Sequence, residues 1–150
     1  MTVSRLIASV GGVGTLPGAP GTWGSLVALL WGVVLMTGPP WALAVATLTA
    51  CAAGFGTIPR CVPDRDADPP WVVIDEVAGQ WIAMLGLGAV TLTGAILAFA
   101  GFRLLDIIKP GPIGWADRQG GAFGIMADDM LAGGVVALAL FAARWAGVPL

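Results

Sequence analysis

The sequence contains no histidine and few charged residues, and both absences narrow the chemistry that it can perform. Because none of the 150 residues is histidine, an imidazole general base, a phosphohistidine and an imidazole metal ligand are all excluded. Charged residues make up only 11% of the chain, compared with roughly 25% in soluble proteins. Any chemistry must therefore depend on carboxylates, cations and hydroxyl groups.

Cysteine is scarce as well, and basic residues are not in excess. The two cysteines, Cys51 and Cys61, lack the spacing of a metal site, and we expect them to pack as small apolar side chains. The formal net charge is −2 and the isoelectric point is near 4.7, so no basic surface is available to neutralise nucleic-acid phosphates. We therefore expect no nucleic-acid partner.

Apolar residues dominate the chain and favour lipid as its solvent. Hydrophobic residues account for 57% of the sequence, and the mean hydropathy is +0.89. The length fits one domain, so we expect residues 1–150 to form a single membrane-embedded unit. Residues 6–10 are apolar but too few for a signal-peptide core, and we expect neither cleavage nor export.

The first long apolar run predicts a helical hairpin. Residues 21–59 include no charged side chain, and Gly38-Pro39-Pro40 divides them in two, because proline and glycine end helices. The limb at residues 41–58 has roughly the 18 apolar residues of a membrane-spanning helix. The limb at residues 25–36 is shorter, and we expect it to tilt or to re-enter the membrane.

The second charge-free run, residues 77–102, predicts two helices rather than one. A single straight helix would place Asp75 and Asp106, which flank this run, on opposite sides of a membrane. Gly86-Leu87-Gly88 and the β-branched residues that follow form its weakest helical stretch. We therefore expect a break there, so that both charged ends lie on one face.

Two polar segments separate the apolar runs. Residues 59–70 are rich in proline and charge, and we expect them to face water. Residues 109–124 contain two prolines and five glycines, which predicts an irregular loop. The positive-inside rule places both segments in the cytoplasm, because they hold or adjoin most of the basic residues, namely Arg60, Arg65, Arg103, Lys109 and Arg118.

The last apolar run predicts a helix that begins near Asp128 and continues to Ala143. Arg144 and Trp145 would then lie near a membrane interface, where cations and indoles are favoured. The predicted fold class is therefore all-α, a multihelical membrane-embedded bundle with short or broken helices and a polar cytoplasmic face.

Carboxylates occur in three groups where apolar runs meet polar segments: Asp75-Glu76, Asp106 with Asp117, and Asp128-Asp129. Acidic residues at the edge of a hydrocarbon region are costly unless they are paired or bind a metal. Helix capping explains Asp75 and Asp128 alone, but it does not require doubled acids. Adjacent pairs instead indicate a metal site, because their carboxylates supply the hard oxygen ligands that Mg²⁺ requires beside a phosphate.

Cations and hydroxyl groups near these acids are candidates for binding phosphate. If residues 102–109 are helical, Arg103, Asp106 and Lys109 share one face and either hold a phosphate or form an intrahelical ion pair. Arg118, next to Asp117, has the same two interpretations.

Two further segments are candidates for roles at the same site. The glycine-rich residues 18–25 lead into the first helix, where backbone N–H groups with Thr22 and Ser25 favour an anion. Gln80 lies one turn after Glu76, where it either orients that carboxylate or joins two helices.

Four segments together resemble the phosphatidylglycerophosphatase A family: PGTWGS at 20–25, VIDEVAG at 73–79, FRLLDIIKPGPI at 102–113 and GIMADD at 124–129. The resemblance extends over most of the chain. It implies a multihelical enzyme that uses Mg²⁺ to hydrolyse phosphatidylglycerol phosphate to phosphatidylglycerol and phosphate. It also implies a multi-pass location in a bacterial inner membrane, with the site facing the cytoplasm. The chain departs from the pattern after Arg118, where many relatives have a histidine and a longer connection.

On this basis we expect Asp75, Glu76, Asp128 and Asp129 to bind Mg²⁺. Whether water or an aspartate attacks the phosphorus stays open, as does the oligomeric state. The alternative function is a non-enzymatic multi-span membrane protein, a small permease or a scaffold. The expected catalytic residues are Asp106, Lys109 and Asp129, and the expected phosphate-binding residues are Thr22, Ser25, Arg103, Lys109 and Arg118.

Overall fold

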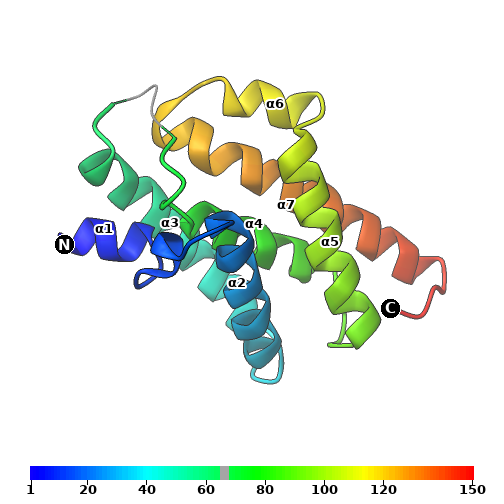
Figure 1. Cartoon of the computed structure of the whole chain (residues 1–150). Helices are drawn as coiled ribbons and strands as arrows, with labels where there is room; N and C mark the ends of the chain where they lie inside the picture. The colour runs from blue at the N-terminus through cyan, green and yellow to red at the C-terminus, as the bar shows by residue number, and fades with distance from the viewer. Residues whose placement is uncertain (65–67) are drawn as a thin grey trace.

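The computed structural model describes residues 1–64 and 68–150, which form seven α-helices and one 3₁₀ turn (Figure 1). These residues include no β-strand, so the predicted all-α fold is confirmed. Arg65 and Asp66, which the sequence places in a polar cytoplasmic segment, lie outside the described residues. The helices are α1 (Val3–Ala8), α2 (Pro20–Met36), α3 (Ala42–Cys61), α4 (Ile74–Leu85), α5 (Leu92–Ile108), α6 (Pro112–Asp117) and α7 (Gly121–Trp145), and the 3₁₀ turn is η1 (Val13–Thr15).

Two of these helices, α3 and α7, are long and apolar enough to cross a membrane, and α2 is a shorter apolar helix. Large apolar side chains are exposed on each of them: Trp31 is 61% exposed, Leu48 is 70% exposed and Leu138 is 72% exposed. Water would not favour so much exposed apolar surface, whereas hydrocarbon does. The outer surface of the fold therefore suits a lipid environment.

The predicted hairpin is confirmed, with two changes at its ends. Its first helix begins at Pro20 rather than Ser25, because proline has the backbone angle of a first helical residue and needs no N–H partner there. Its second helix continues through Pro59 to Cys61. A proline so close to the end of a helix removes only one hydrogen bond. The Val62 N–H then closes the last turn by donating to the Ile58 carbonyl at 2.8 Å.

The predicted break in the second apolar run is confirmed. Helix α4 ends at Leu85 and α5 begins at Leu92, where the Thr91 hydroxyl accepts a hydrogen bond of 2.9 Å from the Gly94 N–H. Arg144, which we expect near a membrane interface, donates a hydrogen bond of 3.2 Å to the Gly86 carbonyl. It thereby satisfies a carbonyl at the end of α4 that lacks a helical partner.

The irregular loop predicted at residues 109–124 is wrong, because part of it is helical. Pro112 opens the short helix α6, and the backbones of Gly111, Gly120 and Gly121 have positive φ angles of 51°, 67° and 59°. The glycines therefore make turns on either side of a helix. A residue with a side chain would adopt these positive φ angles only at a cost. Helix α7 consequently begins at Gly121, ahead of the predicted start near Asp128.

Helix α4 occupies the centre of the fold and packs against α2, α3, α5 and α7 (Figure 1). Its closest neighbour is α7, because glycines face each other at the crossing. A Cβ atom on Gly133 would overlap the Gly79 carbonyl, and one on Gly79 would lie 2.7 Å from the Asp129 carbonyl oxygen. This close approach brings Asp129 beside the first turns of α4.

Candidate active site

Acidic and basic side chains from separate parts of the chain line one cavity of about 240 Å³. Its polar lining contrasts with the apolar surface of the rest of the fold. Six carboxylates face only two cations there, so the cavity is strongly negative. These charged residues are Asp68, Asp75, Glu76, Arg103, Asp106, Lys109, Asp128 and Asp129.

Helix α4 contributes Asp75 and Glu76 from its first turn, as the sequence predicted. Both residues are buried, and the partial positive charge at the start of a helix favours carboxylates there. One Asp75 oxygen accepts a hydrogen bond of 2.9 Å from the Glu76 N–H. Glu76 Oε2 accepts a hydrogen bond of 2.9 Å from Ser25 Oγ and forms an ion pair with Arg103.

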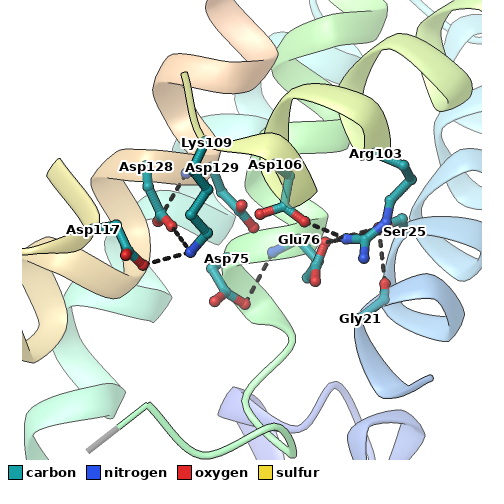
Figure 2. Close-up of polar contacts among 10 residues, drawn as sticks. All are labelled: Gly21, Ser25, Asp75, Glu76, Arg103, Asp106, Lys109, Asp117, Asp128 and Asp129. Atoms are coloured by element: carbon teal, nitrogen blue, oxygen red, sulfur yellow. Dashed lines mark hydrogen bonds and ion pairs between the residues drawn. The ribbon is translucent and has the colours of Figure 1, made fainter. Parts of the chain in front are cut away.

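Ser25 therefore acts inside the fold rather than as a free hydroxyl at a helix start. It is fully buried, and its single hydroxyl proton is shared between Glu76 Oε2 and the Gly21 carbonyl, whose oxygen lies 2.8 Å from Ser25 Oγ. Figure 2 shows Ser25, Glu76 and Arg103 pointing toward one another. This contact fixes the Glu76 carboxylate from the α2 side.

Helix α5 contributes Arg103 and Asp106, which form an ion pair of 2.7 Å across one turn. The intrahelical pair that the sequence allowed is thus present, and the same guanidinium also binds Glu76 on α4. Arg103 consequently bridges two carboxylates of different helices.

Lys109 leaves the face that Arg103 and Asp106 share, because α5 ends at Ile108. Its backbone adopts the left-handed conformation, with a φ angle of 49°, which is uncommon for any residue except glycine. The side chain then forms ion pairs with Asp117 of α6 and with Asp128 of α7, the latter at 2.6 Å (Figure 2).

Asp128 and Asp129 are buried on α7, but they lie inside this helix rather than at its start. The prediction that they open a helix is wrong, because the turn at Gly120 and Gly121 starts α7 earlier. Neither residue is therefore a helix cap. Their burial needs a different explanation, because buried carboxylates are costly unless a cation offsets their charge, as Lys109 does for Asp128.

Three carboxylates come together closely enough to share one ion. An oxygen from each of Glu76, Asp106 and Asp129 lies within 4.8 Å of the other two. Carboxylate oxygens are the ligands that Mg²⁺ prefers, so this donor set fits such an ion. We refer to Glu76, Asp106 and Asp129 as the carboxylate triad, and Asp75 and Asp128 line the same cavity beside it.

The electrostatics of the cavity favour binding of a cation. Burial raises the pKa of Asp75 well above its ordinary value, and the neighbouring Glu76 carboxylate raises it further. Burial and nearby Asp106 also raise the pKa of Glu76, although Arg103 partly offsets this. Burial disfavours the charge on Lys109, but hydrogen bonds to Asp117 and Asp128 outweigh burial and raise its pKa. Lys109 is therefore charged.

Some expected residues lie outside the cavity, and one unexpected residue lines it. Thr22, on the first turn of α2, and Arg118, beside Gly114 at the end of α6, are absent from the described lining. Asp68 does line it, although we expected residues 59–70 to face water. Pro69-Pro70 follows Asp68 and restricts the backbone, and this signal could have indicated a fixed position for Asp68.

Comparison with known proteins gives matches over nearly the whole chain. The family model described as phosphatidylglycerophosphatase A matches residues 6–144. The protein named phosphatidylglycerophosphatase A from Escherichia coli (strain K12) is 36% identical over 141 residues, which cover 91% of this chain and 81% of that protein. The protein of the same name from Haemophilus influenzae is 32% identical over 144 residues, covering 94% of this chain and 88% of that protein.

A further relative has a different name. The putative phosphatidylinositol-3-phosphatase of Bacteroides thetaiotaomicron is 33% identical over 147 residues, which cover 93% of this chain and 92% of that protein. None of the solved structures matches the chain significantly.

Proposed function

Since the chain belongs to the phosphatidylglycerophosphatase A family, we propose that it hydrolyses phosphatidylglycerol phosphate to phosphatidylglycerol and phosphate with the help of Mg²⁺. The observation that supports this chemistry is the carboxylate triad, which gathers oxygens from α4, α5 and α7 within 4.8 Å of one another. The family makes the chain a phosphoric monoester hydrolase, so the alternative of a non-enzymatic permease or scaffold is set aside.

In this proposal Glu76, Asp106 and Asp129 hold the Mg²⁺ ion, and Asp75 and Asp128 complete its acidic surroundings. When bound, Mg²⁺ lowers the pKa of a coordinated water and offsets charge on the phosphoryl oxygens. Ser25 keeps Glu76 in place through its hydrogen bond of 2.9 Å. Asp106 and Asp129 are also the carboxylates available to accept a proton during the reaction.

The two cations of the cavity are suited to bind the phosphate. Arg103 and Lys109 lie on either side of the carboxylates (Figure 2). Both can donate hydrogen bonds to phosphoryl oxygens, whose growing negative charge they would stabilise. The Lys109 side chain is 29% exposed, so a phosphate can reach it from outside. Thr22 and Arg118, which lie outside the described lining of the cavity, would contact the lipid headgroup rather than the phosphate inside it.

The substrate would reach this site from the membrane surface. Ile107, Ile108 and Trp115 are exposed near Lys109, with Ile107 70% exposed and Trp115 54% exposed. Apolar and indole side chains of this kind are favoured where hydrocarbon meets headgroups. We therefore propose a multi-pass inner-membrane protein whose site lies at headgroup level, and the basic residues in and beside the two polar segments, such as Arg60 and Arg118, favour the cytoplasmic side.

The proposal is tested by phosphate release from phosphatidylglycerol phosphate in detergent micelles. Release should require Mg²⁺, stop with excess EDTA and be lost in Asp129→Asn. The matched control is Asp64→Asn, which removes the same charge outside the described lining of the cavity and should retain release. Release that continues in Asp129→Asn would contradict the proposed metal site.

A second substrate distinguishes the two activities named among the relatives. Phosphatidylinositol 3-phosphate should be hydrolysed more slowly than phosphatidylglycerol phosphate if the headgroup is recognised as we propose. Faster release from the inositol lipid would instead assign this chain the specificity named for the Bacteroides protein.

A further inference from the structure

Gln80 is a fully buried, uncharged polar side chain on the same helix as Glu76, and it has no hydrogen-bond partner among the residues that the structure describes. Its exposure is 0%, and neither its amide oxygen nor its amide nitrogen has a partner among the residues that the structure describes. Buried side-chain polar groups in folded proteins nearly always have a partner, because leaving one unpaired costs stability. A buried glutamine without a protein partner therefore indicates that its amide bonds to a molecule outside the chain, such as a bound water.

The position of Gln80 links it to the carboxylate triad. It lies four residues after Glu76 on α4, and residues with this spacing share a face of a helix. One turn further along the same face is Met84, which is fully buried in an apolar cluster with Ala83 and Phe102. Gln80 therefore occupies the boundary between the polar cavity and the apolar core.

Arg103 has a matching unpaired group. Its Nε is buried and has no partner within the described parts of the chain, although its Nη1 binds Glu76, Asp106 and Ser25. Glu76, which this guanidinium binds, shares a face of α4 with Gln80 because the two residues are four apart on the helix. Two unpaired groups, a donor on Arg103 and an amide on Gln80, thus accompany the same carboxylate.

We infer that Gln80 is a positioning residue, which holds the Glu76 carboxylate and the Arg103 guanidinium in their working geometry through buried water. The amide can donate to one partner and accept from another, and a water with several polar partners is stable inside a protein. Such second-layer hydrogen bonds orient metal ligands and tune their affinity. The inference rests on the proposed function, because it assigns Gln80 to the metal and phosphate site.

The test replaces Gln80 by an apolar side chain of similar length in the full-length protein in detergent. Gln80→Met removes the amide oxygen and nitrogen but keeps a side chain of similar length, so the thermal unfolding midpoint without Mg²⁺ should stay close to that of the wild type. The Mg²⁺ concentration that gives half-maximal phosphate release should nevertheless rise about tenfold to a hundredfold, or the maximal rate of release should fall by the same factor. The KM for the lipid should change little. A lower midpoint with an unchanged rate per folded molecule would show a packing role and overturn the inference.

Two further variants separate hydrogen bonding from shape. Gln80→Asn retains an amide and should keep more activity than Gln80→Met, whereas equal losses in both would overturn the inference. Met84→Leu changes packing one turn away without changing polar groups, and its Mg²⁺ requirement should match that of the wild type. Wild-type protein that releases no phosphate with any divalent cation would contradict the proposed function itself, whereas a normal wild type and a normal Gln80→Met would contradict only the role of Gln80.

Discussion

Ser25 and Glu76 are separated by 51 residues in the chain, yet their side chains are joined by a buried hydrogen bond of 2.9 Å. The bond connects the start of α2 to the start of α4. Because Glu76 belongs to the carboxylate triad, a hydroxyl on one helix holds a proposed metal ligand on another. The glycine-rich start of α2 is thereby part of the site.

Replacing Ser25 by alanine tests this link. The change removes one donor to Glu76, and loss of such a contact weakens metal binding or activity by about tenfold to a hundredfold. The measurement is the Mg²⁺ dependence of phosphate release. Thr47→Ala is a matched control, because the buried Thr47 hydroxyl also donates to a carbonyl one turn earlier, at 2.7 Å, but lies on α3 away from the cavity. Equal effects in both variants would contradict the role of Ser25.

The glycine contact between α4 and α7 can be tested with two adjacent residues. A Cβ atom on Gly133 would overlap the Gly79 carbonyl, whereas one on Gly134 would meet nothing within 4 Å. Gly133→Ala should therefore lower the free energy of unfolding by about 1–3 kcal/mol through overpacking and displace Asp129 from Glu76. Gly134→Ala should be neutral or stabilising by up to about 1 kcal/mol. Thermal unfolding and phosphate release measure both effects, and tolerance of Gly133→Ala would show that the two helices need not touch.

Substitutions of Lys109 should separate its proposed contact with the phosphate from its ion pair with Asp128. Lys109→Met removes a donor to the phosphate, and we expect release to fall about a hundredfold to a thousandfold. It also leaves the buried Asp128 without its cation, which lowers stability. Lys109→Arg retains the charge and should keep more of both properties. Arg60→Met, a change of charge on α3 outside the described cavity lining, serves as the control. If Lys109→Met turns over normally, the phosphate contact is wrong.

The orientation in the membrane can be measured by cysteine labelling from either side. The free cysteines Cys51 and Cys61 are first replaced by alanine. A new cysteine at Gln119, near α6, should then react from the cytoplasmic side, and one at Thr37, at the turn between α2 and α3, from the opposite side; these two regions lie at different ends of the fold (Figure 1). Labelling of both from one side would contradict the proposed topology.

Periodicity and glycine-proline signals predicted the helices that such local features define. The hairpin turn at Gly38 and the break at Gly86 follow from the local preferences of glycine and proline. The start of α7 was missed because the glycine pair at Gly120 and Gly121 fits both a loop and a sharp turn into a helix, and only packing decides between them. The same ambiguity concealed α6.

The candidate site was predictable in its residue types but not in its pairings. Doubled acids at the ends of apolar runs pointed to Asp75 and Asp129 because isolated charges are costly there. The Arg103–Asp106 pair follows from its spacing within α5. That Arg103 also binds Glu76, and that Lys109 turns toward Asp128, depends on how helices distant in sequence cross. No local pattern contains that information.

The order of the helices along the chain also governs when activity first appears during synthesis. Ser25, Glu76 and Asp106 leave the ribosome before Asp129, which α7 brings against Gly79. A nascent chain that has not yet delivered α7 to the bilayer holds two members of the triad and no third. Translation products that end before α7 are therefore expected to lack phosphatase activity.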